Sequence, residues 1–140
     1  MFRPLDPNQE VRIIVAEPHS FKNFAEARIW AKQNIVGSYF NPEIGEVKVS
    51  GKAIDKYLSG KAVGKSVSLD THLSALPVLP QLIESSIVGE IHEDRDNNSN
   101  LRDIVRLYGA INHNGMIKRV KITVKRYTDE AQNLRLTVMK

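Results

Sequence analysis

The dipeptide Asn114-Gly115, set between two long stretches of alternating residues, constrains this chain more than any other feature. Asn and Gly tolerate the positive φ angles of a type I′ turn, which joins two antiparallel strands through a two-residue loop. A turn here folds the stretch from Ile104 to Tyr127 back on itself and fixes its register. We therefore expect a long hairpin at the centre of the fold.

The two faces of this hairpin differ in chemistry. Apolar residues oppose one another on one face, which we expect to be the floor of the core. Basic and hydroxyl-bearing residues lie on the other face, which is either a solvated sheet surface or a site for an anion such as phosphate. The apolar pairs are Val105 with Val124, Leu107 with Ile122, and Gly109 with Val120; the other pairs are Arg106 with Thr123, Tyr108 with Lys121, Ile104 with Lys125, and Ala110 with Arg119.

Composition predicts one globular domain over residues 1–140, with residues 1–10 as a polar lead-in arm, because 41% of the residues are apolar and 26% are charged. The chain has no cysteine, which excludes disulfides and thiolate metal sites. It has no apolar run long enough to cross a membrane and no apolar signal core, so we expect a cytoplasmic protein without a membrane partner. The net charge of +4 permits a nucleic-acid partner, and basic residues gather between Arg119 and Arg126 without an acidic one.

The remaining elements follow from local patterns. Helices are expected where apolar residues recur at helical spacing, and strands where β-branched residues meet turn formers. Ser20 and Ser50 are placed to cap the first two helices, and Pro77 and Pro80 should break the third. The expected strands are 11–17, 37–40, 46–50, 87–92 and 134–139; the expected helices are 21–34, 51–58 and 70–86; residues 94–100 form a polar loop.

This order predicts an α+β fold, with N-terminal helices packed on one face of a curved antiparallel sheet that ends in a β-meander. The repeat of Ser-Gly-Lys-Ala at 50–53 and 59–62 is interpreted as a coincidence, because two copies so close do not make a structural repeat. In this interpretation only the first copy begins a helix.

Two apparent ligand motifs are rejected. Residues 60–66 (GKAVGKS) have three residues, instead of four, between the first Gly and Gly-Lys, so they do not form a nucleotide-binding P-loop. Residues 94–105 have the opening spacing of a calcium loop but lack its Gly and its closing Glu. His92, Glu93 and Asp94 are interpreted as a polar strand end, not as a metal site. No metal and no cofactor are expected.

The groups that remain suit metal-independent cleavage of RNA, which needs a base for the 2′-hydroxyl, an acid for the leaving oxygen and cations for the phosphate. His72 lies on an apolar helix face, so it is either a catalytic residue or a buried histidine with satisfied hydrogen bonds. His113, beside the hairpin turn, is expected to be solvated. The other groups considered are Ser50, Lys52, Lys56, Arg106, Tyr108, Lys121, Thr123, Lys125 and Tyr127.

Several short motifs, taken together, carry a family resemblance. They are Phe24-Ala25-Glu26-Ala27 with Trp30-Ala31, Gly37-Ser38-Tyr39-Phe40-Asn41 with Gly45, Thr71-His72-Leu73 with 76–83, and Lys121-Ile122-Thr123-Val124-Lys125. Over about residues 20–139 the chain resembles domains of the large polyvalent proteins of phages and conjugative elements. Those domains are similar to the barnase/EndoU/RelE-like nuclease fold, which implies helices followed by a curved antiparallel sheet that acts on RNA without a metal.

The resemblance implies roles for individual residues. His72 matches the helix histidine and becomes the general acid or base, Thr123 and Lys125 match a Thr-Val-Lys strand, and Lys52 follows the strand-to-helix step. The main hypothesis is therefore an endoribonuclease-like toxin or effector domain of a mobile element, with RNA as substrate and an inhibitor or immunity protein as a further partner. Two alternatives stay open: a binding module without catalysis, and a structural accessory domain. The residues expected to hold nucleic acid are Arg106, Tyr108, Arg119, Lys121 and Tyr127.

Overall fold

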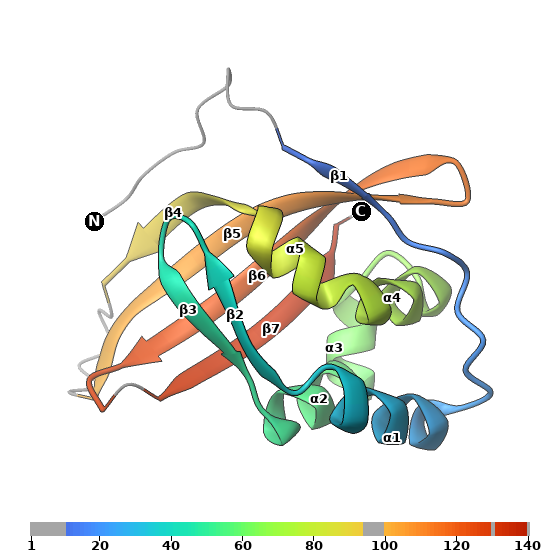
Figure 1. Ribbon diagram of the computed structural model, residues 1–140, viewed down its shortest axis with the longest axis horizontal. Helices are drawn as coiled ribbons and strands as arrows, with labels where there is room; N and C mark the ends of the chain where they lie inside the picture. Colours follow the sequence, from blue (N-terminus) through green and yellow to red (C-terminus); the bar gives the residue numbers. More distant parts are fainter. Residues whose placement is uncertain (1–10, 94–99, 130, 140) are drawn as a thin grey trace.

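The computed structural model describes residues 11–93, 100–129 and 131–139, so the lead-in arm and most of the predicted polar loop lie outside the described residues. Within these ranges a five-stranded sheet, a two-stranded sheet and a set of short helices form the fold (Figure 1). The strands are β1 (Ile13–Val15), β2 (Gly37–Asn41), β3 (Gly45–Val49), β4 (Ile87–His92), β5 (Leu101–His113), β6 (Met116–Tyr127) and β7 (Gln132–Val138). The helices are α1 (Phe24–Asn34), α2 (Gly51–Tyr57), α3 (Gly60–Lys65), α4 (Leu69–Ala75), the 3₁₀ turn η1 (Leu76–Val78) and α5 (Leu79–Ser85).

The central hairpin forms as predicted. β5 and β6 are antiparallel, and every pair expected from the turn is present, including Leu107 with Ile122 and Arg106 with Thr123. Asn114 has φ 54° and Gly115 has φ 79°, which are the positive angles that a type I′ turn requires. The turn chemistry therefore sets which face of each strand is buried.

The strand order is β1-β5-β6-β7, and β4 also pairs with β5. β4 to β7 pair antiparallel, whereas β1 pairs parallel to the end of β5, through Ile13 with Ala110 and Val15 with Asn112. The α+β class is confirmed, but the sheet is mixed and not purely antiparallel. The parallel strand was not foreseen because its partner lies far away in the sequence.

The core lies on the apolar face of the hairpin. Five of its residues have no exposed surface, and fully buried leucines of η1 and α5 belong to the same core cluster. Helix α5 approaches β5 closely: a Cβ placed on Gly109 would lie 2.6 Å from Ser86 Oγ. Gly109 therefore has a packing role, because any larger side chain would push the end of α5 away. The five buried residues are Val105, Leu107, Val120, Ile122 and Val124.

Serine and asparagine caps determine where the helices begin. The cap of α1 is Asn23, whose Oδ1 accepts from Glu26 N at 2.8 Å, so the prediction of Ser20 was wrong and the helix starts three residues later. Ser50 caps α2 as predicted, and Ser59 caps α3 through the same contact. Both copies of Ser-Gly-Lys-Ala therefore begin a helix, so the expectation that only the first does was wrong.

The β2–β3 hairpin packs against the helices and one edge of the sheet. Buried Asn41 donates to the carbonyls of Ile83 and Ser86, each at 2.8 Å, which ties this hairpin to the end of α5. On the other side Gln132 of β7 donates to Glu46 O and accepts from Lys48 N. These contacts hold β3 beside β7 and so position the start of α2.

His113 is not solvated, contrary to expectation. It is 5% exposed and packs against α4, with its ring nitrogens 3.4 Å from Thr71 Oγ1 and 3.4 Å from Asp70 Oδ2. The hairpin tip therefore rests on the first turn of α4. Among the described residues, no helix is both long enough and apolar enough to cross a membrane.

Candidate functional site

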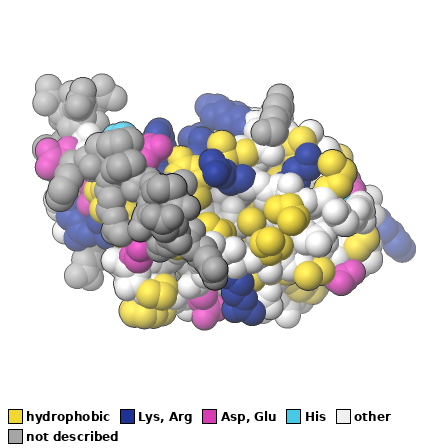
Figure 2. Space-filling model, turned by 90° about the horizontal axis from the view of Figure 1, so that it is seen from above, with side chains coloured by type: hydrophobic (Ala, Val, Ile, Leu, Met, Phe, Trp, Pro, Cys, Tyr) yellow, Lys and Arg dark blue, Asp and Glu magenta, His cyan; other side chains and the backbone are white. Residues whose placement is uncertain are grey.

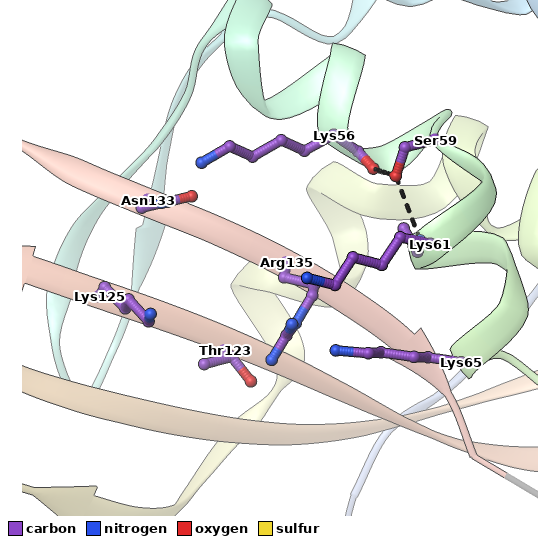
Figure 3. A pocket seen from close by; sticks show the side chains of 9 residues that line it. Lys56, Ser59, Lys61, Lys65, Thr123, Lys125, Asn133 and Arg135 are labelled. Carbon is purple, nitrogen blue, oxygen red and sulfur yellow. Dashed lines mark hydrogen bonds between the residues drawn. The ribbon is translucent and has the colours of Figure 1, made fainter.

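A cationic pocket lies where helices α2 and α3 meet the outer face of β6 and β7 (Figure 3). Its volume is about 280 Å³. Of the described residues that line it, five are basic and none is acidic. We define the cationic pocket by its lining residues, which are Lys56, Ser59, Lys61, Ala62, Lys65, Thr123, Lys125, Asn133 and Arg135.

Strand alternation supplies the floor of this pocket. Thr123 pairs with Arg135, and Lys125 pairs with Asn133, on two adjacent strands. The residues between them in sequence are buried in the core, so these four side chains point to the opposite face of the sheet. Thr123 is only 6% exposed and is the most buried of these four residues.

Two short helices supply the wall. Lys61 and Lys65 are four residues apart in α3 and so lie on one side of it, and Figure 3 shows both side chains extending toward Arg135. The end of α3 is fixed to β7, because Val138 N donates to Ser66 Oγ at 3.0 Å. Residues 60–66 therefore form a helix and not a P-loop, yet their lysines reach an anion-binding position.

The electrostatics of the pocket are dominated by unpaired positive charge. None of its five cations has a carboxylate partner within the part of the chain that the structure describes. The pKa of Lys65 is lowered, mainly by the charge of Arg135, then by desolvation and by Lys61 and Lys121. This lowering reflects repulsion between like charges, which an anion bound in the pocket would relieve.

The predicted site residues divide into three groups: those in or beside the cationic pocket, those near β4, and His72 in the core. Thr123 and Lys125 line the cationic pocket, and Lys121 is close enough to lower the pKa of Lys65. Lys52 and Tyr127 line an adjoining cavity of about 230 Å³, which shares Lys56 and Asn133 with the pocket. These residues form one basic surface along β6, β7 and α2.

The other predicted nucleic-acid contacts lie toward β4. Arg106 Nη1 donates to Glu90 Oε2 at 2.8 Å, and Tyr108 Oη donates to Glu90 Oε1 at 3.2 Å. The Arg119 guanidinium lies over the Tyr108 ring, 5.8 Å from its centroid. Arg106 is thus partly neutralised by a carboxylate that the hairpin pattern alone did not indicate.

His72 is not brought to this surface. It has no exposed area, its Nδ1 is 2.7 Å from Ser66 Oγ, and its Nε2 is 2.7 Å from Tyr57 O. Because a carbonyl only accepts, Nε2 carries the hydrogen and Ser66 Oγ donates to Nδ1. Burial lowers the pKa of His72, and the hydrogen bond to Tyr57 partly opposes this. Of the two interpretations left open, the buried and satisfied histidine fits the geometry.

The sequence did not indicate that residues of α3 and β7 line the pocket. The signal for the α3 residues was the repeated Ser-Gly-Lys-Ala, since each copy places a lysine at the start of a capped helix. Among the described residues no group of three or more His, Cys, Asp or Glu side chains is arranged to hold a metal ion, and Asp94 lies outside them. The missed residues are Ser59, Lys61, Lys65, Asn133 and Arg135.

Apolar exposure occurs at a different end of β6. Exposed hydrophobic side chains lie on β1 and at the start of β6, and Figure 2 shows hydrophobic side chains interspersed with Lys and Arg on the upper surface. The cationic pocket lies near the other end of β6, so the two surfaces are distinct. The exposed hydrophobic residues of these two strands are Ile13, Val15, Met116 and Ile117.

Comparison with known proteins identifies a family. The family model of large polyvalent protein-associated domain 3 matches residues 20–134, which is most of the chain. The chain therefore belongs to this family. No curated protein and no solved structure matches it.

Proposed function

For this member of the large polyvalent protein-associated domain 3 family, we propose that the cationic pocket binds RNA through its sugar-phosphate backbone. The convergence of five cations without carboxylate partners among the described residues carries this proposal. Backbone phosphates are the anions that Lys and Arg clusters bind in nucleic acids, and such contacts dominate affinity.

The size and lining of the pocket favour part of a polymer over a free small molecule. A volume of about 280 Å³ is below the range typical of sites that enclose a whole ligand. None of the described residues that line it is aromatic, so these residues offer no stacking surface for a base. Thr123 and Asn133 bring hydroxyl and amide groups that can pair with a ribose 2′-hydroxyl, which favours RNA over DNA.

Cleavage of RNA, as expected from the nuclease resemblance, needs an acid and a base at the phosphate. His72 cannot supply them from the core, so binding is the function that the pocket alone supports. We keep the toxin or effector role and the cytoplasmic site of action as parts of the proposal. An inhibitor protein is also part of it, because a mobile element that carries a domain directed at RNA needs a way to restrain that domain.

A salt titration of binding tests the proposal. Labelled single-stranded RNA is titrated with protein by fluorescence anisotropy at several salt concentrations, beside a DNA of the same sequence. The test variant is Lys61→Gln with Lys65→Gln. The matched control is Arg28→Gln with Lys32→Gln, which removes the same charge from α1, where both side chains pair with Asp55.

We expect the pocket variant to bind RNA at least 10-fold more weakly. Its slope of log K against log salt should fall by about 1.4, since each cation contributes about 0.7 on a single strand. The control should keep most of the affinity and the slope. Equal losses in both variants would mean that net charge, and not this pocket, binds RNA. Tighter binding of poly-glutamate than of RNA would instead assign the pocket to an acidic protein.

A further inference from the structure

A second cluster of polar side chains lies on the same outer face of the sheet, at β4. Glu90 Oε2 accepts from His92 Nε2 at 2.7 Å and from Arg106 Nη1 at 2.8 Å, and its Oε1 accepts from Tyr108 Oη at 3.2 Å. The Glu90 side chain is 22% exposed, and those of His92 and Arg106 are 37% and 39% exposed. A carboxylate, an imidazole, a guanidinium and a phenol are thus in contact and open to solvent.

A β-bulge in β4 creates this arrangement. Val88 pairs with Leu107, but the register then shifts, so that Glu90 and not Gly89 pairs with Arg106. Without the shift, Glu90 would pair with Val105 and point into the core. Bulges often redirect a side chain in this way near functional sites. The redirection brings a carboxylate to the basic face of the hairpin.

The strand registers connect this cluster to the cationic pocket. Glu90 pairs with Arg106, Arg106 with Thr123, and Thr123 with Arg135, so these residues form one row across four strands. Adjacent strands lie about 4.8 Å apart, which places the Glu90 backbone roughly 10 Å from that of Thr123, in the floor of the pocket. A polynucleotide held in the pocket can therefore reach the cluster along the same face.

We propose that Glu90 and His92 are the general base and general acid of a metal-independent RNA cleavage reaction, which rests on the proposed RNA binding. The Glu90 carboxylate takes the proton of a ribose 2′-hydroxyl. The 2′-oxygen forms a bond to the adjacent phosphorus as the bond from phosphorus to the 5′-oxygen breaks. Protonated His92 gives its proton to that 5′-oxygen. The products are a 2′,3′-cyclic phosphate and a 5′-hydroxyl.

The contacts within the cluster suit these roles. Glu90 and His92 are hydrogen-bonded to each other at 2.7 Å, so the proposed reaction requires the two side chains to separate and admit the phosphodiester between them, because base and acid act on opposite sides of the phosphorus. After the reaction Glu90 holds a proton and His92 lacks one, and their shared hydrogen bond returns the proton directly. Arg106 is placed to neutralise the phosphate, with guanidinium donors beyond the one that Glu90 occupies.

The charges around Glu90 keep it ionised. Its pKa is lowered, mainly by the hydrogen bond from His92, then by those from Arg106 and Tyr108 and the charge of Arg106, against desolvation, which raises it. On the far side of Tyr108, β6 adds the cation Arg119. The Glu90 carboxylate is therefore ionised at neutral pH and able to accept the proton of a 2′-hydroxyl.

The experiment is cleavage of a labelled single-stranded RNA in the presence of EDTA, with analysis of the product ends. We expect the wild-type protein to produce 2′,3′-cyclic phosphate ends and to leave DNA of the same sequence intact. Glu90→Gln and His92→Gln should each slow cleavage about 100-fold or more. The control is Glu84→Gln, which removes an exposed carboxylate of α5 and should cut at the wild-type rate.

Binding of uncleavable 2′-O-methyl RNA separates the two proposals. We expect both cluster variants to bind it as tightly as the wild type. Wild-type protein that binds this RNA but does not cleave RNA would overturn the catalytic inference and leave the RNA-binding function intact. Absence of binding both to this RNA and to unmodified RNA in the salt titration would overturn the RNA-binding function itself. If Glu90→Gln fails to fold, His92→Gln still tests the catalytic proposal. Cleavage at the wild-type rate by His92→Gln would refute the role of His92 as the general acid.

Discussion

Replacing His72 should unfold part of the helical layer before it changes any chemistry at the surface. Two hydrogen bonds join Tyr57 and His72, each from one side chain to the backbone carbonyl of the other residue. Tyr57 Oη donates to His72 O at 2.5 Å, and His72 Nε2 donates to Tyr57 O at 2.7 Å. Their rings are 4.2 Å apart between centroids. Ser66, which donates to His72 Nδ1, also accepts from Val138 N. His72 thus joins α2, α4 and β7 through one buried network.

The size of the loss follows from these contacts. His72→Ala removes two hydrogen bonds and leaves the Tyr57 carbonyl and the Ser66 hydroxyl buried without their partner, at about 1–3 kcal/mol for each group. It also leaves a cavity where a fully buried ring was. We expect the free energy of unfolding to fall by about 3–5 kcal/mol. Tyr57→Phe, which removes only the phenol, should cost about 1–2 kcal/mol.

The same residue predicts a pH dependence. Because the pKa of His72 is lowered in the folded protein, the unfolded chain binds the proton more readily. The stabilisation is therefore complete above the unfolded pKa of about 6.5 and is lost as pH falls from there toward the folded pKa. In that window one proton changes the free energy of unfolding by up to about 1.4 kcal/mol per pH unit.

Urea denaturation followed by circular dichroism at pH 5, 6, 7 and 8 measures both effects. His72→Gln is the comparison for pH, because it lacks the titrating ring, so the difference between its curve and the wild-type curve isolates His72. Loss of less than about 1 kcal/mol in His72→Ala, or a His72 contribution that grows as pH falls below 6.5, would refute the structural role. Folded His72→Gln that no longer cleaves RNA would restore the catalytic one.

Three further substitutions test the packing, one of them as a control. Gly109→Ala should lower the melting temperature and cost about 1–3 kcal/mol of unfolding free energy, since its Cβ would lie 2.6 Å from Ser86 Oγ. The control is Gly64→Ala in α3, which has nothing within 4 Å and should be neutral or stabilising. Equal effects of the two substitutions in thermal melts would contradict this packing. Asn41→Ala should cost about 2–4 kcal/mol in urea denaturation, because it leaves two carbonyls at the end of α5 without a donor; a loss below 1 kcal/mol would show that water replaces the amide.

The central hairpin could be predicted because its information is local. Asn114 and Gly115 determine the turn, the turn determines the register, and the register sorts Leu107 to the core and Thr123 to the outer face. The segments that pair with or contact this hairpin from elsewhere in the chain could not be predicted in this way. The parallel strand β1 and the carboxylate of Glu90 reach β5 from other parts of the chain, and no local pattern sets either pairing.

Only the residues that β6 contributes to the candidate site could be predicted, because only they depend on a local pattern. Thr123 and Lys125 follow from the alternation of β6, but Lys61 and Arg135 come together only because α3 is held against the end of β7. His72 was the opposite case, since its helical spacing with buried leucines pointed to the core and the family resemblance pointed to the surface. Periodicity was the better guide there.

The parallel strand β1 has a consequence for how the molecule folds and opens. Its partner residues lie roughly a hundred positions away in sequence, whereas β4, β5, β6 and β7 pair with neighbours along the chain. Contacts of such long separation form late, so the antiparallel strands should assemble first and β1 should add last. In the native protein β1, with three residues, should also detach first, and its amides should exchange with solvent faster than those of β5 and β6. Because β1 contributes no residue to the cationic pocket or to the Glu90 cluster, opening at this edge should leave both in place.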